Sequence, residues 1–117
     1  DVCSSDLEVP VIEVVINNHV LGMVRQWQDL FYDERYSATV LRDAVDYVKL
    51  AEAMGAEGMR ATTQEEFREA FAKALASGRP VLIDCMIDCD DKVWPMVAPG
   101  AAISEAFDEQ DLKEKNR

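Results

Sequence analysis

The sequence is poor in positive charge, has a single histidine and lacks any long apolar run. Of its 117 residues, 12 are lysine or arginine and 23 are aspartate or glutamate, which gives a formal net charge of −11. This charge repels phosphate backbones, so we expect no nucleic-acid partner. No apolar run approaches the roughly 20 residues that cross a bilayer, and none resembles a signal peptide. We therefore expect no membrane partner and a cytoplasmic location.

Cysteine is scarce, and its placement argues against a disulfide framework. The three cysteines are Cys3, Cys85 and Cys89, and such an odd number is typical of a reducing compartment. Cys85 and Cys89 lie in CMIDC, within a predicted strand, where their spacing puts both on one face. A metal pair is the alternative, but no second pair or histidine cluster completes it. We expect two small buried residues.

The first seven residues, DVCSSDL, match the translation of a common sequencing-library adapter that runs directly into EVPVIEVV. We expect residues 1–7 to be an artefact and the natural protein to continue upstream, which would make this chain a fragment. With 49% hydrophobic residues it can still bury a core. Residues 8–105 are predicted to form one part of a folded domain. The charged tail, residues 106–117, is expected to fray.

Apolar strands and amphipathic helices alternate along the chain. The β-branched run over 11–16 predicts a mostly buried strand. The apolar residues that follow keep helical spacing and form one stripe opposite a polar face. The stripe comprises Val20, Met23, Val24, Trp27, Leu30 and Phe31, and the polar face comprises Arg25, Gln26, Gln28 and Asp29.

The next elements are a helix over about 44–54, a strand over 56–62, a helix opened by a Thr63–Glu66 capping box, and a strand over 81–88. Beyond them a proline-rich passage holds a short helix. The core positions predicted for the two helices are Tyr47, Leu50, Ala51, Met54, Phe67, Ala70, Phe71, Ala74 and Leu75. This order predicts an α/β fold with a parallel sheet between helices.

Asn17 and Asn18 stand where a predicted strand ends and a helix begins. In open α/β sheets ligands lie beyond the carboxyl ends of the strands, and a helix N-terminus suits a diphosphate. An amide oxygen is acceptable to Mg²⁺, and Gly22 permits close backbone approach. These features together suggest a metal-bridged diphosphate. The alternative is an ordinary cap, because asparagine is common in turns and at helix N-caps.

The flanking segments resemble one enzyme family. VPVIEVVINNHVLGMVRQWQDLFY, RYSATVL, YVKLAEAMGAEGMR, RPVLIDCMID and KVWPMVAPGAAISE look like the C-terminal part of the acetolactate synthase (acetohydroxyacid synthase) large, catalytic subunit. The resemblance runs from about residue 8 to residue 105, and LGMVRQWQ and PMVAPGA are its specific motifs. The Gly-Asp-Gly half of the family's thiamine-diphosphate motif belongs upstream and is absent. Val45 and Ala98 stand where many relatives have proline, which puts local loop geometry in doubt.

The resemblance implies the C-terminal part of a three-layer, parallel-sheet thiamine-diphosphate-binding fold, with site residues but no catalytic residue in this chain. The Asn18 side chain and the Val20 backbone carbonyl would ligate Mg²⁺. Those two residues, with Leu21, Gly22 and Met23, would form the cofactor site. His19 would be an exposed loop residue. The substrate channel would be lined by Trp27, Met96, Pro99 and Gly100, although periodicity alone makes Trp27 a core residue.

The implied reaction condenses pyruvate with pyruvate or 2-ketobutyrate and releases CO₂, in the biosynthesis of isoleucine and valine. The cofactor supplies the carbanion chemistry, and the protein orients it. An activating glutamate from a partner subunit and FAD on a middle domain would both lie outside this chain, so the chain alone is expected to be inactive. A homodimer or higher oligomer is implied, with or without a regulatory small subunit. The alternatives are another thiamine-diphosphate decarboxylase or oxidase, and a non-catalytic α/β binding module.

Overall fold

The chain forms two compact units, which are described separately. The computed structural model describes residues 7, 9–42 and 45–115. The first unit, called the sheet unit, comprises residues 1–20 and 40–89. The second, called the helix unit, comprises residues 21–39 and 90–117. Among the described residues, no helix has the length and apolar character needed to cross a bilayer.

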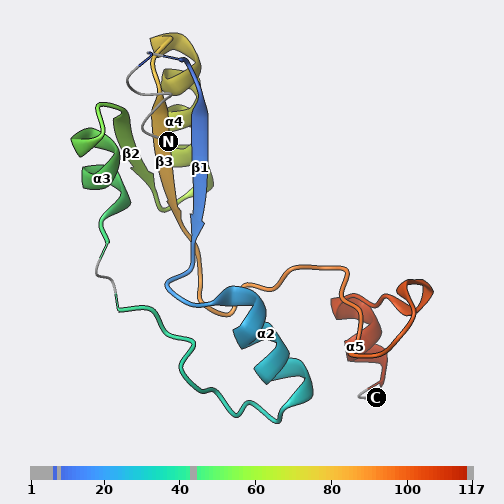
Figure 1. The fold of residues 1–117 in the computed structure, drawn as a ribbon. Coiled ribbons are helices and arrows are strands. Elements are labelled where there is room, and N and C mark those ends of the chain that lie inside the picture. The colour runs from blue at the N-terminus through green and yellow to red at the C-terminus, as the bar shows by residue number, and fades with distance from the viewer. Residues whose placement is uncertain (1–6, 8, 43–44, 116–117) are drawn as a thin grey trace. The chain divides into compact units, whose positions relative to one another are not determined.

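The sheet unit is an α/β structure built on three parallel strands (Figure 1). Strand β3 (Val81–Met86) lies between β1 (Ile12–Asn17) and β2 (Glu57–Ala61). The helices of this unit are α3 (Tyr47–Ala53) and α4 (Gln64–Ser77). The predicted order of elements and the parallel sheet are therefore confirmed.

The two helices cover opposite faces of the sheet. Ala61 of β2 joins a core with residues of β3 and α4, made of Ala70, Ala74, Val81, Ile83 and Cys85. Gly58 projects the other way, because successive strand residues alternate between faces. A Cβ atom on Gly58 would lie 2.6 Å from the Val48 carbonyl oxygen, so α3 packs directly against this glycine. The predicted three-layer arrangement is thus present in the sheet unit.

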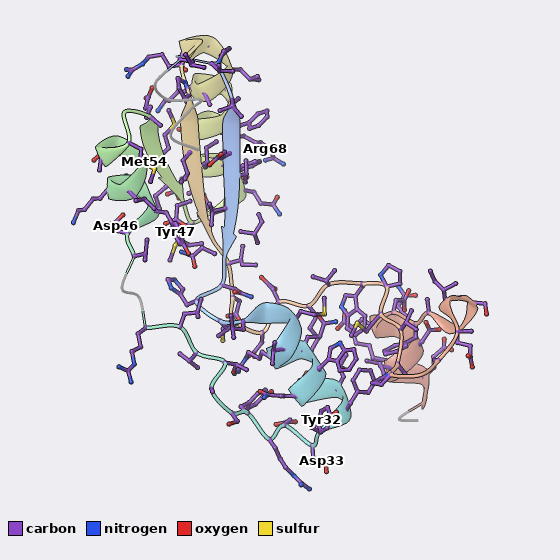
Figure 2. All side chains as sticks on the ribbon, viewed as in Figure 1. Tyr32, Asp33, Asp46, Tyr47, Met54 and Arg68 are labelled. Carbon is purple, nitrogen blue, oxygen red and sulfur yellow. The ribbon has the colours of Figure 1, made fainter. Side chains whose placement is uncertain are left out.

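Helix boundaries follow from local capping. The Thr63 hydroxyl accepts from the Glu66 N–H while the Glu66 carboxylate accepts from the Thr63 N–H, which confirms the predicted capping box. Helix α3 begins at Tyr47, three residues later than predicted, because Asp46 caps it by accepting from the N–H groups of Val48 and Lys49. Figure 2 shows Asp46 and Tyr47 at the start of α3, with Met54 at its other end.

Several predictions for the sheet unit are wrong. Strand β1 is an edge strand with exposed fractions of 38% at Val14 and 63% at Ile16, because among the described strands only β3 pairs with it. Four of the predicted core positions on the helices are exposed: Leu50 and Met54 at 39%, Phe71 at 37% and Leu75 at 65%. Strand β3 ends at Met86, so Cys89 lies beyond it and does not share a strand face with Cys85.

The prediction of two buried cysteines is confirmed for Cys85 and wrong for Cys89. Cys85 is buried and Cys89 half-buried, and both are free thiols. Burial, with a smaller effect of Asp84, raises the pKa of the Cys85 thiol, which keeps it protonated. Cys3 lies outside the described residues.

The helix unit contains α2 (Gly22–Phe31), a 3₁₀ turn (Ile103–Glu105) and α5 (Glu109–Lys115). The 3₁₀ turn and α2 match the predicted short helix and apolar-stripe helix. Helix α5 lies within the charged tail that was expected to fray. It forms because Asp108 accepts from the N–H groups of Gln110 and Asp111, while Asp111 accepts from the Asp108 N–H.

Candidate functional site

The end of β1 is a tight turn held by two asparagine side chains. Asn17 donates from Nδ2 to Asp84 Oδ1 at 3.0 Å, and its Oδ1 accepts from the His19 N–H at 3.2 Å. Asn18 Oδ1 accepts from the Val20 N–H at 3.3 Å, which is a second Asx turn. His19 between them has a φ of 58°, in the left-handed region that closes such turns.

The backbone carbonyl of Val20 points away from the segment that contains Val40. Val20 and Val40 form an isolated antiparallel bridge, in which Leu41 donates to the His19 carbonyl. In this pattern the N–H and C=O groups of the bridged residue face away from the partner segment. The Val20 N–H binds Asn18 Oδ1, so the Val20 carbonyl lies on the same side as that amide. Among the described residues, nothing donates to the Val20 carbonyl.

These two oxygens have the chemistry of a hard-cation site. An amide oxygen and a backbone carbonyl are neutral oxygen ligands of the type that Mg²⁺ accepts. The amide oxygen has two lone pairs, so the bond from the Val20 N–H leaves one for a cation. Two neutral ligands are too few for an octahedral ion. The rest must therefore come from water, from a phosphate or from outside this chain.

Helix α2 begins without a side-chain cap. Its N-cap residue is Leu21, which makes no capping bond, and its first turn holds no acidic residue. Neither asparagine therefore acts as the helix cap that the sequence left open. Within the part of the chain that the structure describes, no side chain accepts from the first N–H groups of α2, which is the condition under which a helix N-terminus binds an anion. Gly22 begins the helix, and Leu21 and Met23 are about half exposed, at 46% and 49%.

Behind the turn, a buried carboxylate links three elements of the sheet unit. Asp84 is 1% exposed and accepts from Asn17 of β1 and from Arg60 Nε of β2, the latter at 3.1 Å. Arg60 also donates from Nη2 to Asp46 Oδ1 at 3.0 Å. The Asp84 bond raises the pKa of Arg60. The Lys49 backbone N–H and then Arg60 lower the pKa of Asp46. Asp84 was not predicted from the sequence, although an aspartate inside the apolar run VLIDCM was a signal.

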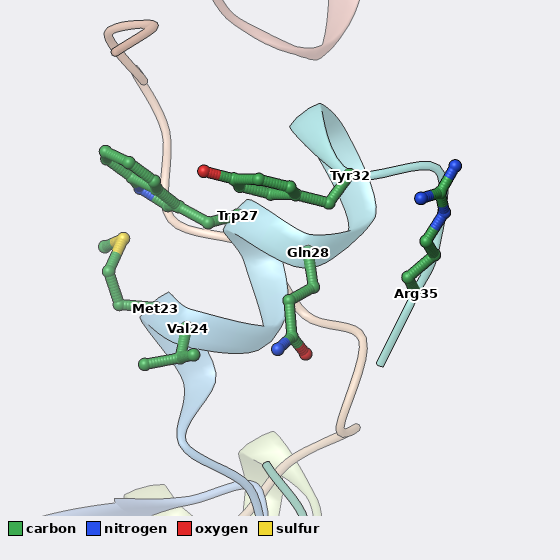
Figure 3. Close-up of a pocket in the computed structure, with 6 residues that line it drawn as sticks. All are labelled: Met23, Val24, Trp27, Gln28, Tyr32 and Arg35. Carbon is green, nitrogen blue, oxygen red and sulfur yellow. The ribbon is translucent and has the colours of Figure 1, made fainter. Parts of the chain in front are cut away.

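In the helix unit, a hollow of about 490 Å³ lies along α2 (Figure 3). Its lining residues are Met23, Val24, Trp27, Gln28, Tyr32 and Arg35. Figure 3 shows Trp27 projecting from α2 on the same side as Met23. Trp27 is only half-buried, and its ring meets Phe31 edge-on with centroids 5.7 Å apart. It is therefore both a packing residue and a wall of an open hollow.

The other predicted channel residues lie elsewhere in the helix unit. Met96 is buried and pairs with Phe107 through two backbone hydrogen bonds of 2.8 Å. Pro99 and Gly100 are exposed, and Gly100 has a φ of 80°. None of these three lines the hollow beside Trp27. Their place in a substrate channel stays a prediction.

Gln26 is buried, although the sequence placed it on the polar face of α2. It is 3% exposed, donates from Nε2 to the Val93 carbonyl at 2.9 Å and accepts from the Val93 N–H at 2.8 Å. This amide holds the segment after residue 90 against α2. Ion pairs of Arg25 with Asp90 at 2.7 Å and of Lys92 with Asp29 at 2.8 Å flank it.

Asp29 is a second polar centre of the helix unit. Although burial acts to raise its pKa, the hydrogen bonds from Lys92 and Tyr36 outweigh burial and lower it. The hydrogen bond from the Tyr36 hydroxyl to Asp29 Oδ1, 2.7 Å long, raises the pKa of Tyr36 to about 12. The Arg25 guanidinium lies over the Tyr36 ring, 4.1 Å from its centroid. This cluster is structural, since it joins α2 to the loop that follows it.

Known proteins are similar to this chain in sequence and in fold. Residues 4–85 match the thiamine pyrophosphate enzyme family in its C-terminal TPP binding domain. An acetolactate synthase of Mycobacterium leprae is 48% identical over 101 residues, covering 82% of this chain and 16% of the relative. The acetolactate synthase isozyme 2 large subunit of Escherichia coli is 43% identical over 101 residues, covering 86% of this chain and 18% of the relative.

A solved structure gives the same answer for the fold. The thiamine diphosphate-dependent 4-hydroxybenzoylformate decarboxylase of Rhodococcus jostii superimposes with a TM-score of 0.66 at 28% identity, over 74% of this chain and 16% of that protein. The chain therefore spans less than a fifth of the relatives it matches, with shares of 16% and 18%. Because the family match covers most of its residues, the chain belongs to the thiamine pyrophosphate enzymes, through their C-terminal TPP-binding domain.

Proposed function

We propose that this chain is the cofactor-binding part of an acetolactate synthase catalytic subunit. The complete enzyme would condense pyruvate with pyruvate or 2-ketobutyrate and release CO₂, in branched-chain amino-acid biosynthesis. The observation that carries the proposal is the turn after β1, where the Asn18 amide oxygen and the Val20 carbonyl face one side. The identities of 43–48% to acetolactate synthases support this activity over others in the family.

In this proposal the chain binds and orients the cofactor. Asn18 and the Val20 carbonyl would hold Mg²⁺, with a third protein ligand from outside this chain. The uncapped N-terminus of α2, with Leu21, Gly22 and Met23, would receive the diphosphate through its N–H groups and partial positive charge. Thiamine diphosphate, when bound, supplies the carbanion chemistry. The exposed apolar side chains of Leu21 and Met23 would exclude water from its surroundings.

The substrate side of the site is assigned to the helix unit. We place Trp27, Met96, Pro99 and Gly100 along the substrate channel, and the hollow beside Trp27 supports the first of these assignments. FAD would bind mainly outside this chain. The complete enzyme would be a homodimer or higher oligomer, with or without a regulatory subunit. Its free thiols at Cys85 and Cys89 suit the reducing cytoplasm.

The test uses the complete enzyme that contains this sequence. Thiamine diphosphate binding is measured by equilibrium dialysis at several Mg²⁺ concentrations, and the product formed from pyruvate is identified. We expect Mg²⁺-dependent binding and acetolactate. Asn18→Ala should abolish the Mg²⁺ dependence. His19→Asn is the matched control, because it changes the neighbouring side chain and asparagine tolerates the left-handed φ of 58°. The 117-residue chain alone should form no acetolactate.

Each outcome has a distinct meaning. Acetaldehyde or acetyl phosphate as product would replace the proposal by a decarboxylase or oxidase, the class that the Rhodococcus structural relative exemplifies. Binding of the cofactor without turnover would indicate a non-catalytic module. If Asn18→Ala binds cofactor and Mg²⁺ as the parent does, the metal-ligand assignment is wrong.

A further inference from the structure

We propose that Asp84 is a positioning residue for the cation site: it sets the orientation of the Asn17 amide and thereby holds the turn that presents Asn18 and Val20. Asp84 touches neither the cation nor the cofactor in this scheme. The inference rests on the proposed function, because it assigns a role in binding Mg²⁺. It concerns residues of the sheet unit alone.

The first step is the burial of the Asp84 charge. A carboxylate that is 1% exposed loses its hydration, and this costs free energy unless hydrogen bonds and an opposite charge replace the water. Arg60 and Asn17 provide them, one to each carboxylate oxygen. Yet an apolar side chain at such a position is often as stable as a buried ion pair or more so. The aspartate is therefore a costly way to fill the sheet, and its arrangement points to a positional role.

The second step is the geometry of the sheet. Asp84 of β3 lies directly opposite Arg60 of β2 and opposite Val15 of β1 in the strand register. Asn17, two residues after Val15, has its side chain on the same face and reaches back to Asp84. Arg60 is held in turn by Asp46, the cap of α3. The carboxylate thus has a rigid backing on one side and the last residue of β1 on the other.

The third step is the chemical asymmetry of the Asn17 amide. A carboxylate only accepts hydrogen bonds, so Asn17 must turn its NH₂ group toward Asp84. Its oxygen then faces the other way and accepts from the His19 N–H at 3.2 Å. That bond closes the turn at His19, and the next one, from the Val20 N–H to Asn18 Oδ1, orders the two oxygens assigned to the cation. Groups bonded directly to metal ligands commonly orient them, and here Asn17 and Asp84 act one step further out, through the turn at His19.

An isosteric change at position 84, Asp84→Asn, would reverse the orientation of the Asn17 amide. In Asp84→Asn, the Arg60 guanidinium still requires an oxygen, because it can only donate. The new NH₂ group therefore faces Asn17, which must flip its own amide to accept from it. The flipped Asn17 points an NH₂ group at the His19 N–H, and the bond that closes the turn is lost. The shape of the side chain at position 84 is unchanged, so packing alone does not predict this effect.

The experiment measures Mg²⁺ directly, in the complete enzyme, as the concentration that gives half-maximal thiamine diphosphate binding in equilibrium dialysis. We expect Asp84→Asn to raise it severalfold, by less than the roughly tenfold or more typical of losing a direct partner of a metal ligand, because Asp84 acts through Asn17. Asn17→Ala should raise it similarly while leaving the Asp84–Arg60 ion pair intact, and it decides the matter if Asp84→Asn does not fold. The double variant Asn17→Asp/Asp84→Asn re-creates both hydrogen bonds with donor and acceptor exchanged. It should return the value to the parental level or below.

Asp46→Asn is the matched control. It replaces the charge beside Arg60 by a neutral amide whose oxygen can still accept from Arg60 and cap α3, so it should lower the thermal unfolding temperature slightly without raising the Mg²⁺ requirement. The proposal is overturned if Asp84→Asn and Asn17→Ala keep the parental Mg²⁺ requirement, or if Asp46→Asn raises it as much as they do. A parent enzyme that binds thiamine diphosphate without Mg²⁺ would instead overturn the proposed function, and the role of Asp84 with it.

Discussion

The buried amide of Gln26 provides a sharp test of how the helix unit is held together. It exchanges two hydrogen bonds with the backbone of Val93, of 2.8 and 2.9 Å, while only 3% exposed. Gln28, two residues on, makes the same pair of bonds to the backbone of Ser37, both at 3.2 Å, at an exposed site. The two glutamines thus differ in burial but not in bonding pattern, and each is the control for the other.

The expected loss in free energy of unfolding differs between the two glutamine-to-alanine variants. A hydrogen bond contributes about 1 kcal/mol net, and a buried group left without a partner costs about 1–3 kcal/mol. Gln26→Ala removes two bonds and the packing of a side chain that is only 3% exposed, so we expect it to lower the free energy of unfolding by about 2–4 kcal/mol. Water can replace the bonds lost in Gln28→Ala, which should cost less than about 1 kcal/mol.

Urea unfolding of the 117-residue chain, followed by tryptophan fluorescence, measures the difference in stability between the two variants. Both tryptophans, Trp27 and Trp94, belong to the helix unit, so the signal reports on it. With a slope of about 2 kcal/mol per molar urea, Gln26→Ala should shift the midpoint by roughly 1–2 M and Gln28→Ala by less than about 0.5 M. Equal shifts for the two variants would refute the argument that burial makes the Gln26 bonds matter.

Three further predictions concern packing and charge. Gly58→Ala should lower the free energy of unfolding by about 1–3 kcal/mol in urea, because its Cβ would overlap Val48. Since its neighbours hold the pKa of Asp46 below the usual 3.8, its contribution to stability is present above about pH 4 and lost on acidification, so Asp46→Asn should be less stable than the parent at neutral pH but not at pH 2–3. Asp29→Asn should lower the pKa of Tyr36 from about 12 toward 10 in an absorbance titration, and an unchanged midpoint would contradict the assigned hydrogen bond.

Much of the local structure was predictable from short stretches of sequence. The capping box at Thr63 and Glu66 depends on residues three apart, and the glycine at 78 ends α4 with a φ of 63° because it tolerates that conformation. The β-branched run that forms β1 and the 3.6-residue spacing of α2 are equally local. The alternation of these elements was enough to predict the parallel sheet.

Burial was predicted less well, because it depends on which surfaces the fold brings together. Ile16 and Leu75 are apolar and were expected inside, but no described element covers them, and they are 63% and 65% exposed. Gln26 is polar and was expected outside, but the segment that contains Val93 lies over it. In each case burial depends on whether an element distant in sequence lies over the side chain, and the spacing of apolar residues does not contain that information.

For the candidate site, too, the local pattern was predictable from the sequence, whereas the contacts of its side chains were not. The sequence by itself determined that two asparagines follow a strand and precede a helix, and its motifs determined the family. The tertiary structure alone decided how they are used: Asn17 turns inward to Asp84, 67 residues away, while Asn18 and Val20 turn two oxygens to one side. Asp84 in turn meets Arg60, 24 residues before it. A parallel sheet creates these contacts because it aligns the carboxyl ends of strands that are far apart in the chain.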